Sequence, residues 1–347
     1  ACNCFKNNNL FNIICSYGVQ INSTKVPNLN FLSNLSYHII YQNAKINRID
    51  KYLYENISII FLDLSNNQIV KIEDGSFDKI LNLNQNKLEA INRFMFSNLN
   101  NLEILEFGYN LIKKIDSDSF STSITKLLLQ VNSLSLSKNE KIFYNLSNLT
   151  FLNLEGNSLI GIFKASFNQA YSNLEILRLS ENQLEFIEAN SFGKMINLKQ
   201  LELNNNKLSY LEKGIFSNLN KLVILDLSQN LLSFLKFDHF IGLENLEYLK
   251  ISENMIKTID INTFYNLKNL DVELSLSSQD LYNLEPNMFI YQEKIQIISL
   301  EYNYLTFLKE NTFFGLVNLK ELDLGNNRIN DFHSDAFNGL ESINMIY

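Results

Sequence analysis

The chain has 347 residues, of which 46% are apolar and 19% charged, and its formal net charge is −8. The apolar content is too high for a disordered chain. The sequence also contains no run of about 20 apolar residues, the length that a membrane-spanning helix needs. The excess of Asp and Glu over Lys and Arg argues against nucleic-acid binding, which needs a basic face. The length allows two or three globular domains or one long repeat array. Asn and Leu are unusually frequent, with 54 and 57 copies, which points to a repeated motif.

All three cysteines lie within the first fifteen residues, as Cys2, Cys4 and Cys15. Three thiols without a suitably spaced histidine make an incomplete zinc set. Disulfide chemistry in an oxidising compartment is therefore favoured over a metal site. The odd number leaves one cysteine free or paired outside this chain.

One motif then recurs twelve times. Each copy is centred on an Asn, which Gln279 replaces in one copy. Apolar residues lie five and three places before this amide, and Leu or Ile lies two places after it. The twelve amide positions are Asn67, Asn86, Asn110, Asn132, Asn157, Asn182, Asn206, Asn230, Asn254, Gln279, Asn303 and Asn327. Their mean spacing is about 24 residues, a period typical of solenoid repeats. Phe follows ten residues after the amide in eleven copies, and Ile142 is the exception.

The spacing of the motif predicts its structure. Apolar residues that alternate with period two predict a short strand with one buried face in every copy. The Asn after the strand predicts a turn in which the side-chain amide satisfies backbone groups. Repetition aligns these amides in a ladder and the Phe side chains in a second stack. Because a single coil leaves apolar faces open, we expect one cooperative solenoid, preceded by a weaker coil with Ala44 in the Asn position.

The motif L-x-x-L-x-L-x-x-N-x-L, as in Leu174, Leu177, Leu179, Asn182 and Leu184, resembles the leucine-rich repeat superfamily. The period and the Phe column are similar to the "typical" subclass of animal extracellular receptors and matrix proteins. The resemblance implies an α/β-type solenoid, a leucine-rich repeat horseshoe with a parallel concave β-sheet and an irregular or short-helical convex side. Residues 35–347 would form this single solenoid of about twelve repeats after the irregular first coil.

The resemblance extends to both ends of the chain. Cys-x-Cys followed about ten residues later by Cys is similar to the second to fourth cysteines of the N-terminal cap of extracellular leucine-rich repeat proteins. Residues 1–34 are therefore expected to form a partial disulfide cap. The usual family pairing implies a bond between Cys2 and Cys15, with Cys4 bonded to a cysteine upstream. Residues 339–347 begin another coil without a cysteine-bearing C-terminal cap, so we expect a fragment or a piece of an ectodomain.

Five segments have the N-x-S/T pattern of N-glycosylation acceptors. They begin at Asn22, Asn34, Asn56, Asn145 and Asn148. All five fall in the cap or on the expected convex crossovers and none falls on a strand. These positions favour a glycoprotein.

Signatures of catalysis and of cofactor binding are absent from the sequence. His38, His239 and His333 lack the spacing of metal ligands, and there is no Gly-rich phosphate loop or G-x-S-x-G elbow. We therefore expect a binding module with no enzymatic activity, no cofactor and no metal site.

The expected binding surface is the concave sheet, where outward side chains lie six, four, two and one residues before the Asn. Across the repeats these positions carry eleven acidic and three basic residues. The acidic residues are Asp63, Glu106, Glu155, Glu181, Glu202, Asp226, Glu253, Glu273, Glu301, Glu321 and Asp323, and the basic residues are Lys126, Arg178 and Lys250. Such a field would attract a basic partner. Alternatively, the carboxylates only keep an open sheet soluble and unpaired.

The position six residues before the Asn is apolar in eight of the twelve repeats. Neighbouring coils align these side chains in an apolar stripe, which either covers the strands or forms the apolar part of a protein interface. We predict that a partner binds the middle and C-terminal concave surface, with Tyr248 contributing most of the binding energy. The predicted contact residues are Glu202, Ile224, Asp226, Tyr248, Glu253, Glu273, Ile297, Glu301, Glu321 and Asp323.

These features predict non-catalytic recognition of a protein partner, basic in character, by an extracellular receptor, adhesion or matrix module. A first alternative is a secreted accessory subunit of an enzyme complex, resembling the non-catalytic leucine-rich partner of arthropod luciferases. A second is an intracellular inhibitor scaffold for basic proteins. That scaffold fits the charge, but such inhibitors use longer alternating repeats and lack a cysteine-rich cap. The partner's identity and the oligomeric state stay open.

Overall fold

The computed structural model describes residues 2–7, 10–15, 36–49, 58–72, 79–93, 95–96, 99–138, 142–167 and 171–347. The chain divides into two compact units, unit 1 (residues 1–158) and unit 2 (residues 159–347). Each unit has its own run of parallel strands and its own apolar core. The only helix among the described residues is a single 3₁₀ turn, η1 (Phe237–Phe240), which is far too short to cross a membrane.

Unit 1 starts with an antiparallel hairpin of β1 (Cys2–Asn7) and β2 (Leu10–Cys15), and β3 (Ser36–Ile40) pairs with β2 in parallel. Parallel strands then follow in chain order: β5 (Ser58–Asp63), β7 (Ile80–Asn82), β9 (Ile104–Glu106), β11 (Lys126–Leu128) and β12 (Phe151–Asn153). Two short parallel pairs lie away from this sheet. They are β4 (Arg48–Ile49) with β6 (Lys71–Ile72), and β8 (Ala90–Ile91) with β10 (Lys114–Ile115).

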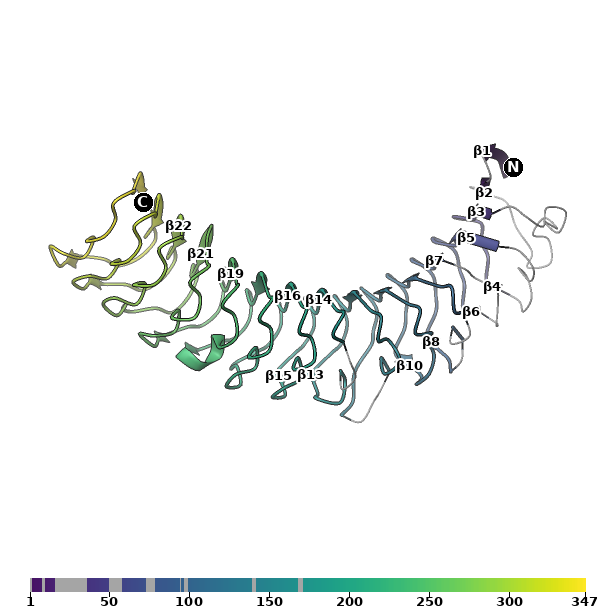
Figure 1. Ribbon diagram of the computed structural model, residues 1–347, viewed down its shortest axis with the longest axis horizontal. Helices are drawn as coiled ribbons and strands as arrows, with labels where there is room; N and C mark the ends of the chain where they lie inside the picture. Colours follow the sequence, from purple (N-terminus) through teal and green to yellow (C-terminus); the bar gives the residue numbers. More distant parts are fainter. Residues whose placement is uncertain are drawn as a thin grey trace. The chain divides into compact units, whose positions relative to one another are not determined.

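Unit 2 repeats the arrangement with parallel strands in chain order (Figure 1). These are β14 (Ile176–Arg178), β16 (Gln200–Glu202), β17 (Ile224–Asp226), β19 (Tyr248–Lys250), β21 (Glu273–Ser275), β22 (Ile297–Ser299), β24 (Glu321–Asp323) and β26 (Met345–Ile346). The short pairs are β13 (Gly161–Ile162) with β15 (Phe186–Ile187), β18 (Phe234–Leu235) with β20 (Thr258–Ile259), and β23 (Phe307–Leu308) with β25 (Asp331–Phe332). The structure thus confirms the predicted solenoid of stacked parallel strands.

The core of both units consists of the apolar columns of the repeat. The residues five and three places before the amide are buried in all twelve copies. The Phe column is buried at every described position from Phe96 to Phe313. At the one exception, both Ile142 and its neighbour Phe143 are buried. Phe143 therefore supplies an aromatic ring to the core that the ten-residue spacing did not predict.

The predicted amide ladder is present. The Asn206 Nδ2 donates to the carbonyl oxygens of Leu179 and Leu203, both at 3.0 Å, and its Oδ1 accepts from the backbone N–H of Leu184 at 3.0 Å. One side chain therefore closes its own turn and also binds the preceding coil. In the weak first coil, the Asn67 Oδ1 accepts from the N–H groups of both Ala44 and Ile46, at 2.9 and 3.2 Å.

The turn also has a backbone conformation that the motif did not reveal. The residue directly before the amide has a left-handed φ, between 52° and 63°, in all twelve repeats. Gly and Asn adopt this conformation readily, whereas bulky residues do so rarely. Tyr109, Val131 and Tyr302 nevertheless occupy it.

Candidate protein-binding surface

The outward side chains of unit 2 form two rows because the strands pair without a register shift. The first row holds the residues six places before the amide, and the second row holds those four places before it. Along the strands the first row is Ile176, Gln200, Ile224, Tyr248, Glu273, Ile297 and Glu321, and the second row is Arg178, Glu202, Asp226, Lys250, Ser275, Ser299 and Asp323. We call these two rows the outer face. Eight of the ten predicted contact residues lie on it.

From Tyr248 to Glu321 the first row alternates apolar and acidic side chains. Tyr248 is 36% exposed and Glu273 is exposed, whereas Ile224, Ile297 and Glu321 are partly buried. Ile297 lies in register between Glu273 and Glu321. This row therefore presents apolar surface next to carboxylates, instead of a separate apolar stripe beside an acidic one.

Charges in the second row are partly compensated. The Arg178 Nε lies 3.2 Å from the Glu202 Oε2, and the Gln200 Nε2 donates to the Glu202 Oε1 at 2.5 Å. Asp226 is in register with Lys250. Asp323 is instead in register with Ser299, and Ser299 is in register with Ser275. Within the two rows, the carboxylates of β21 and β24 therefore have no basic residue in register beside them.

Two predicted contact residues lie on turns instead of strands. Glu253 has a left-handed φ of 54°, and its Oε2 accepts from the Gln229 Nε2 at 3.0 Å. The Glu301 Oε1 accepts from the Asn326 Nδ2 at 3.1 Å. Both glutamates thus border the edge of the outer face at which the strands end.

In unit 1, acidic residues of the equivalent rows are used in local hydrogen bonds. Asp63 is buried, and its two carboxylate oxygens accept from the Gln42 Nε2 at 2.7 Å and the Ser65 N–H at 2.9 Å. The Glu106 Oε2 accepts from the Asn84 Nδ2 at 2.7 Å. Burial raises the pKa of Glu106, opposed by the Asn84 hydrogen bond and reinforced by the Asp63 charge. These carboxylates are therefore engaged in hydrogen bonds within the unit.

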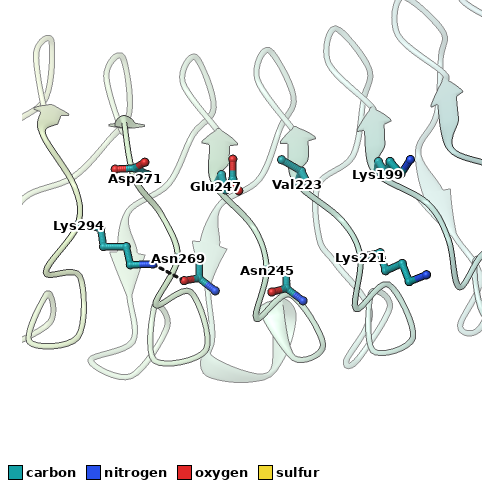
Figure 2. A pocket seen from close by; sticks show the side chains of 8 residues that line it. All are labelled: Lys199, Lys221, Val223, Asn245, Glu247, Asn269, Asp271 and Lys294. Atoms are coloured by element: carbon teal, nitrogen blue, oxygen red, sulfur yellow. Dashed lines mark hydrogen bonds between the residues drawn. The ribbon is translucent and has the colours of Figure 1, made fainter.

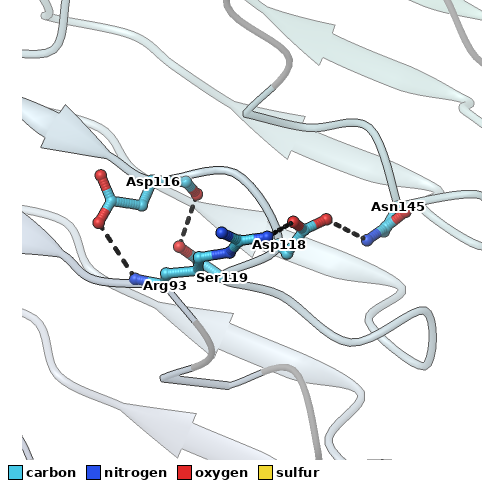
Figure 3. A network of polar contacts seen from close by, with 5 residues as sticks. All are labelled: Arg93, Asp116, Asp118, Ser119 and Asn145. Carbon is cyan, nitrogen blue, oxygen red and sulfur yellow. Dashed lines mark hydrogen bonds and ion pairs between the residues drawn. The ribbon is translucent and has the colours of Figure 1, made fainter.

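Two of the five glycosylation acceptors lie in the described part of unit 1. The Asn145 Nδ2 donates to the Asp118 Oδ1 at 3.2 Å, and the Asp118 Oδ2 lies 3.1 Å from the Arg93 Nη2 (Figure 3). Asn148 is exposed, and its amide donates to the Thr122 carbonyl at 2.9 Å. Asn22, Asn34 and Asn56 lie outside the described residues.

The cysteine side chains also lie outside the described part of the structure, but the backbone register of Cys2 and Cys15 is defined. These two residues are directly opposite each other in the β1–β2 hairpin. Opposed residues in an antiparallel pair have Cα atoms about 4.5–5.5 Å apart, within the range that a disulfide spans. The Cys2–Cys15 bond, and the bond of Cys4 to an upstream cysteine, stay predictions.

A groove of about 540 Å³ lies where the strands of unit 2 begin, at the end away from the amide turns (Figure 2). It is lined by Lys199, Lys221, Val223, Asn245, Glu247, Asn269, Asp271 and Lys294. Two of its lysines form hydrogen bonds with neighbouring asparagines. The Lys294 Nζ donates to the Asn269 Oδ1 at 2.7 Å, and the Lys221 Nζ donates to the Asn197 Oδ1 at 2.6 Å. Among the residues with described side chains, no three His, Cys, Asp or Glu residues cluster as metal ligands.

Comparison with known protein families agrees with the repeat pattern and the stacked strands. The "Leucine rich repeat" pattern matches residues 79–134, 172–232, 222–281, 272–329 and 293–347, and a second pattern of the same description matches residues 148–170. The chain belongs to the leucine-rich repeat family. In this leucine-rich repeat protein, the matched residues include every strand of unit 2 that builds the outer face.

Individual relatives are similar to parts of this leucine-rich repeat chain. It is 35% identical to lumican of Bos taurus over 139 residues, which are 38% of this chain and 39% of lumican. It is 36% identical to lumican of Oryctolagus cuniculus over 135 residues, which are 36% of this chain and 67% of that sequence. The chain thus spans 39% of the length of the bovine protein.

Solved structures share the fold. A leucine-rich repeat protein of Leptospira interrogans has a TM-score of 0.70 and 24% identity, covering 91% of this chain and 84% of its own. The Toll–Spatzle complex of Drosophila has a TM-score of 0.70 and 21% identity, covering 85% of this chain and 45% of the matched chain. At these identities the likeness shows the fold alone.

Proposed function

We propose that this leucine-rich repeat chain is a non-catalytic module that binds a protein partner through the outer face of unit 2. The observation that carries the proposal is the first row, in which Tyr248 and Glu273 are exposed side chains on strands only three residues long. Protein interfaces combine an apolar centre with a polar rim, and the alternation of Ile, Tyr and Glu in this row supplies both. Exposed aromatic side chains are also the usual anchors of such interfaces.

The partner's binding surface is basic. Glu273, Glu321 and Asp323 lie at the C-terminal end of the outer face, where Lys250 is the nearest basic residue of the two rows. Carboxylates on an open surface attract a basic partner and accelerate its association. The same charge makes the interaction sensitive to salt.

The site of action is extracellular, as a receptor, adhesion or matrix module. Similarity to lumican, an extracellular matrix protein, supports this location, as do the five glycosylation acceptors and the opposed Cys2 and Cys15. The Toll structure with Spatzle shows that a solenoid of this fold can hold a protein ligand. A secreted accessory subunit would use the same outer face and would differ in having an enzyme as its partner.

Carbodiimide cross-linking of the isolated complex tests this proposal, because it joins carboxylates directly to lysines of a bound protein. We expect cross-links from Glu273, Glu321 and Asp323. Glu212 and Glu310 are exposed carboxylates on crossovers and serve as internal controls. Cross-links confined to these two controls would show that the partner binds another side of the unit.

A further inference from the structure

The turns of two neighbouring repeats at the C-terminal end of unit 2 carry three tyrosines, of which Tyr282 and Tyr302 are exposed. Tyr302 is 57% exposed and Tyr282 is 54% exposed. The rings of Tyr282 and Tyr304 stack with centroids 5.4 Å apart and planes 19° apart. We call Tyr282, Tyr302 and Tyr304 the tyrosine edge. Clustered exposed aromatic side chains mark interaction sites more often than isolated ones do.

The position of Tyr302 has no structural explanation in the turn. Its φ of 54° is left-handed, a conformation that suits Asn or Gly better than an aromatic residue. Asn66, Asn205 and Asn326 occupy the same position in other repeats. The Tyr302 ring is mostly exposed and contributes little to the core, so its side chain is free to contact another molecule.

The tyrosine edge already binds one guanidinium group. The Arg328 guanidinium lies 4.5 Å from the ring centroid of Tyr304, and Tyr282 stacks on the same ring. Guanidinium groups stack on tyrosine by cation–π attraction and planar contact. The exposed rings of Tyr282 and Tyr302 offer the same chemistry to an arginine from outside.

Carboxylates next to the tyrosine edge complement such an arginine. Glu301 precedes Tyr302 in the chain, and the Asp323 Oδ1 accepts from the Gly325 N–H at 2.8 Å. A Cβ atom at Gly325 would lie 3.0 Å from the Asp323 Oδ1 and 3.4 Å from the Glu301 Cγ. Both acidic side chains therefore pack against this glycine, whose carbonyl oxygen accepts from the Tyr302 N–H at 3.1 Å.

We propose that the tyrosine edge docks an extended segment of the protein partner that carries arginine. The guanidinium stacks on Tyr302 and pairs with Glu301. Arginine is preferred over lysine because its planar group both stacks and forms paired hydrogen bonds with a carboxylate. This inference rests on the proposed function and names the chemistry that the partner presents to one edge of the outer face.

Two peptides of equal length test the proposal on the full chain, one alternating arginine with glycine and the other lysine with glycine. Titration by isothermal calorimetry should show tighter binding of the arginine peptide. The Tyr302→Asn variant should weaken that binding roughly three- to thirty-fold. Because Asn suits the left-handed turn, the variant should unfold at or above the wild-type temperature, which confirms that it folds.

Tyr109→Asn is the matched control, since Tyr109 occupies the same turn position in unit 1 and is 54% exposed. We expect it to leave binding of the arginine peptide unchanged.

Equal binding of the two peptides, or equal effects of the two variants, would overturn the docking site. If Tyr302→Asn has no effect while cross-links still form at Glu273 and Glu321, the tyrosine edge is excluded and the outer face remains the binding surface. If Tyr302→Asn weakens peptide binding but the partner cross-links only through crossovers, the docking site stands and the outer face is excluded.

Discussion

Asn206 illustrates how much of this fold depends on single side chains. It is buried, its Oδ1 accepts from Leu184, and its Nδ2 has backbone carbonyls in two coils within reach. Asn206→Ala leaves these backbone groups without partners in a place that water cannot easily reach. We expect a loss of roughly 1–3 kcal/mol in the free energy of unfolding, measured by denaturant titration.

Gln279 shows what a longer amide can preserve at this position. Its Nε2 donates to the Ile251 carbonyl at 2.7 Å, and its Oε1 accepts from the Ile256 N–H at 3.2 Å. Asn206→Gln should therefore destabilise the protein less than Asn206→Ala. If both variants unfold like the wild type, the amide ladder does not contribute to stability.

The N-terminal hairpin gives a second test at the scale of single residues. Cys2 and Cys15 are opposed in β1 and β2, and an oxidising compartment would join them. Peptide mapping of secreted protein without reduction should recover the two cysteines in one linked fragment. Recovery of both as free thiols would argue against the disulfide and against an extracellular location.

The Phe column also couples neighbouring coils of unit 2. Phe289 stacks on Phe264 at 5.7 Å and on Phe313 at 6.5 Å. Phe289→Ala removes both contacts and leaves a cavity, so we expect a loss of about 3–5 kcal/mol. Phe314→Ala is the control, because the Phe314 side chain is 42% exposed and its loss should cost far less in the same unfolding measurement.

The 3₁₀ turn η1 places a buried histidine in unit 2. His239 is buried, and its Nδ1 accepts from the Lys236 N–H at 3.2 Å. Burial lowers the pKa of His239, and Lys236 lowers it further, whereas Asp238 and Asp260 oppose the shift. Because the unfolded chain then binds more protons than the folded chain, stability falls as the pH drops through the ordinary histidine pKa of about 6.5.

The His239→Gln variant tests this pH dependence. Between pH 8 and pH 5, the unfolding free energy of the wild type should fall relative to that of the variant. His38 and His333 are present in both proteins, so their titration cancels in the difference. A difference that stays constant across this range would show that His239 titrates alike in the folded and unfolded states.

The strands, the amide ladder and the Phe column could be predicted from the sequence, because each follows from a fixed spacing between residues. The left-handed residue before each amide was not predicted, since Tyr109, Val131 and Tyr302 are poor markers of that conformation. The ion pair between Arg178 and Glu202 was also missed. It depends on side-chain conformations across two coils, which a list of outward positions does not contain.

The proposed binding surface extends along unit 2, because consecutive coils each contribute side chains to the outer face. The ion pair with Arg178 makes Glu202 a poor place to reverse a charge, since the change would also disturb the unit. Glu273 and Glu321 are better choices. They lie on separate strands, β21 and β24, with Ile297 between them in register.

The association rate of the isolated partner, measured at several salt concentrations, tests the central claim most directly. The double variant Glu273→Lys with Glu321→Lys should slow association about tenfold or more at low salt and flatten its salt dependence, whereas Tyr248→Ala should mainly speed dissociation. Lys164→Glu changes an exposed crossover residue of the same unit and should leave the rate and its salt dependence close to wild type. Normal association of the double variant, together with slow association of Lys164→Glu, would contradict binding through the outer face.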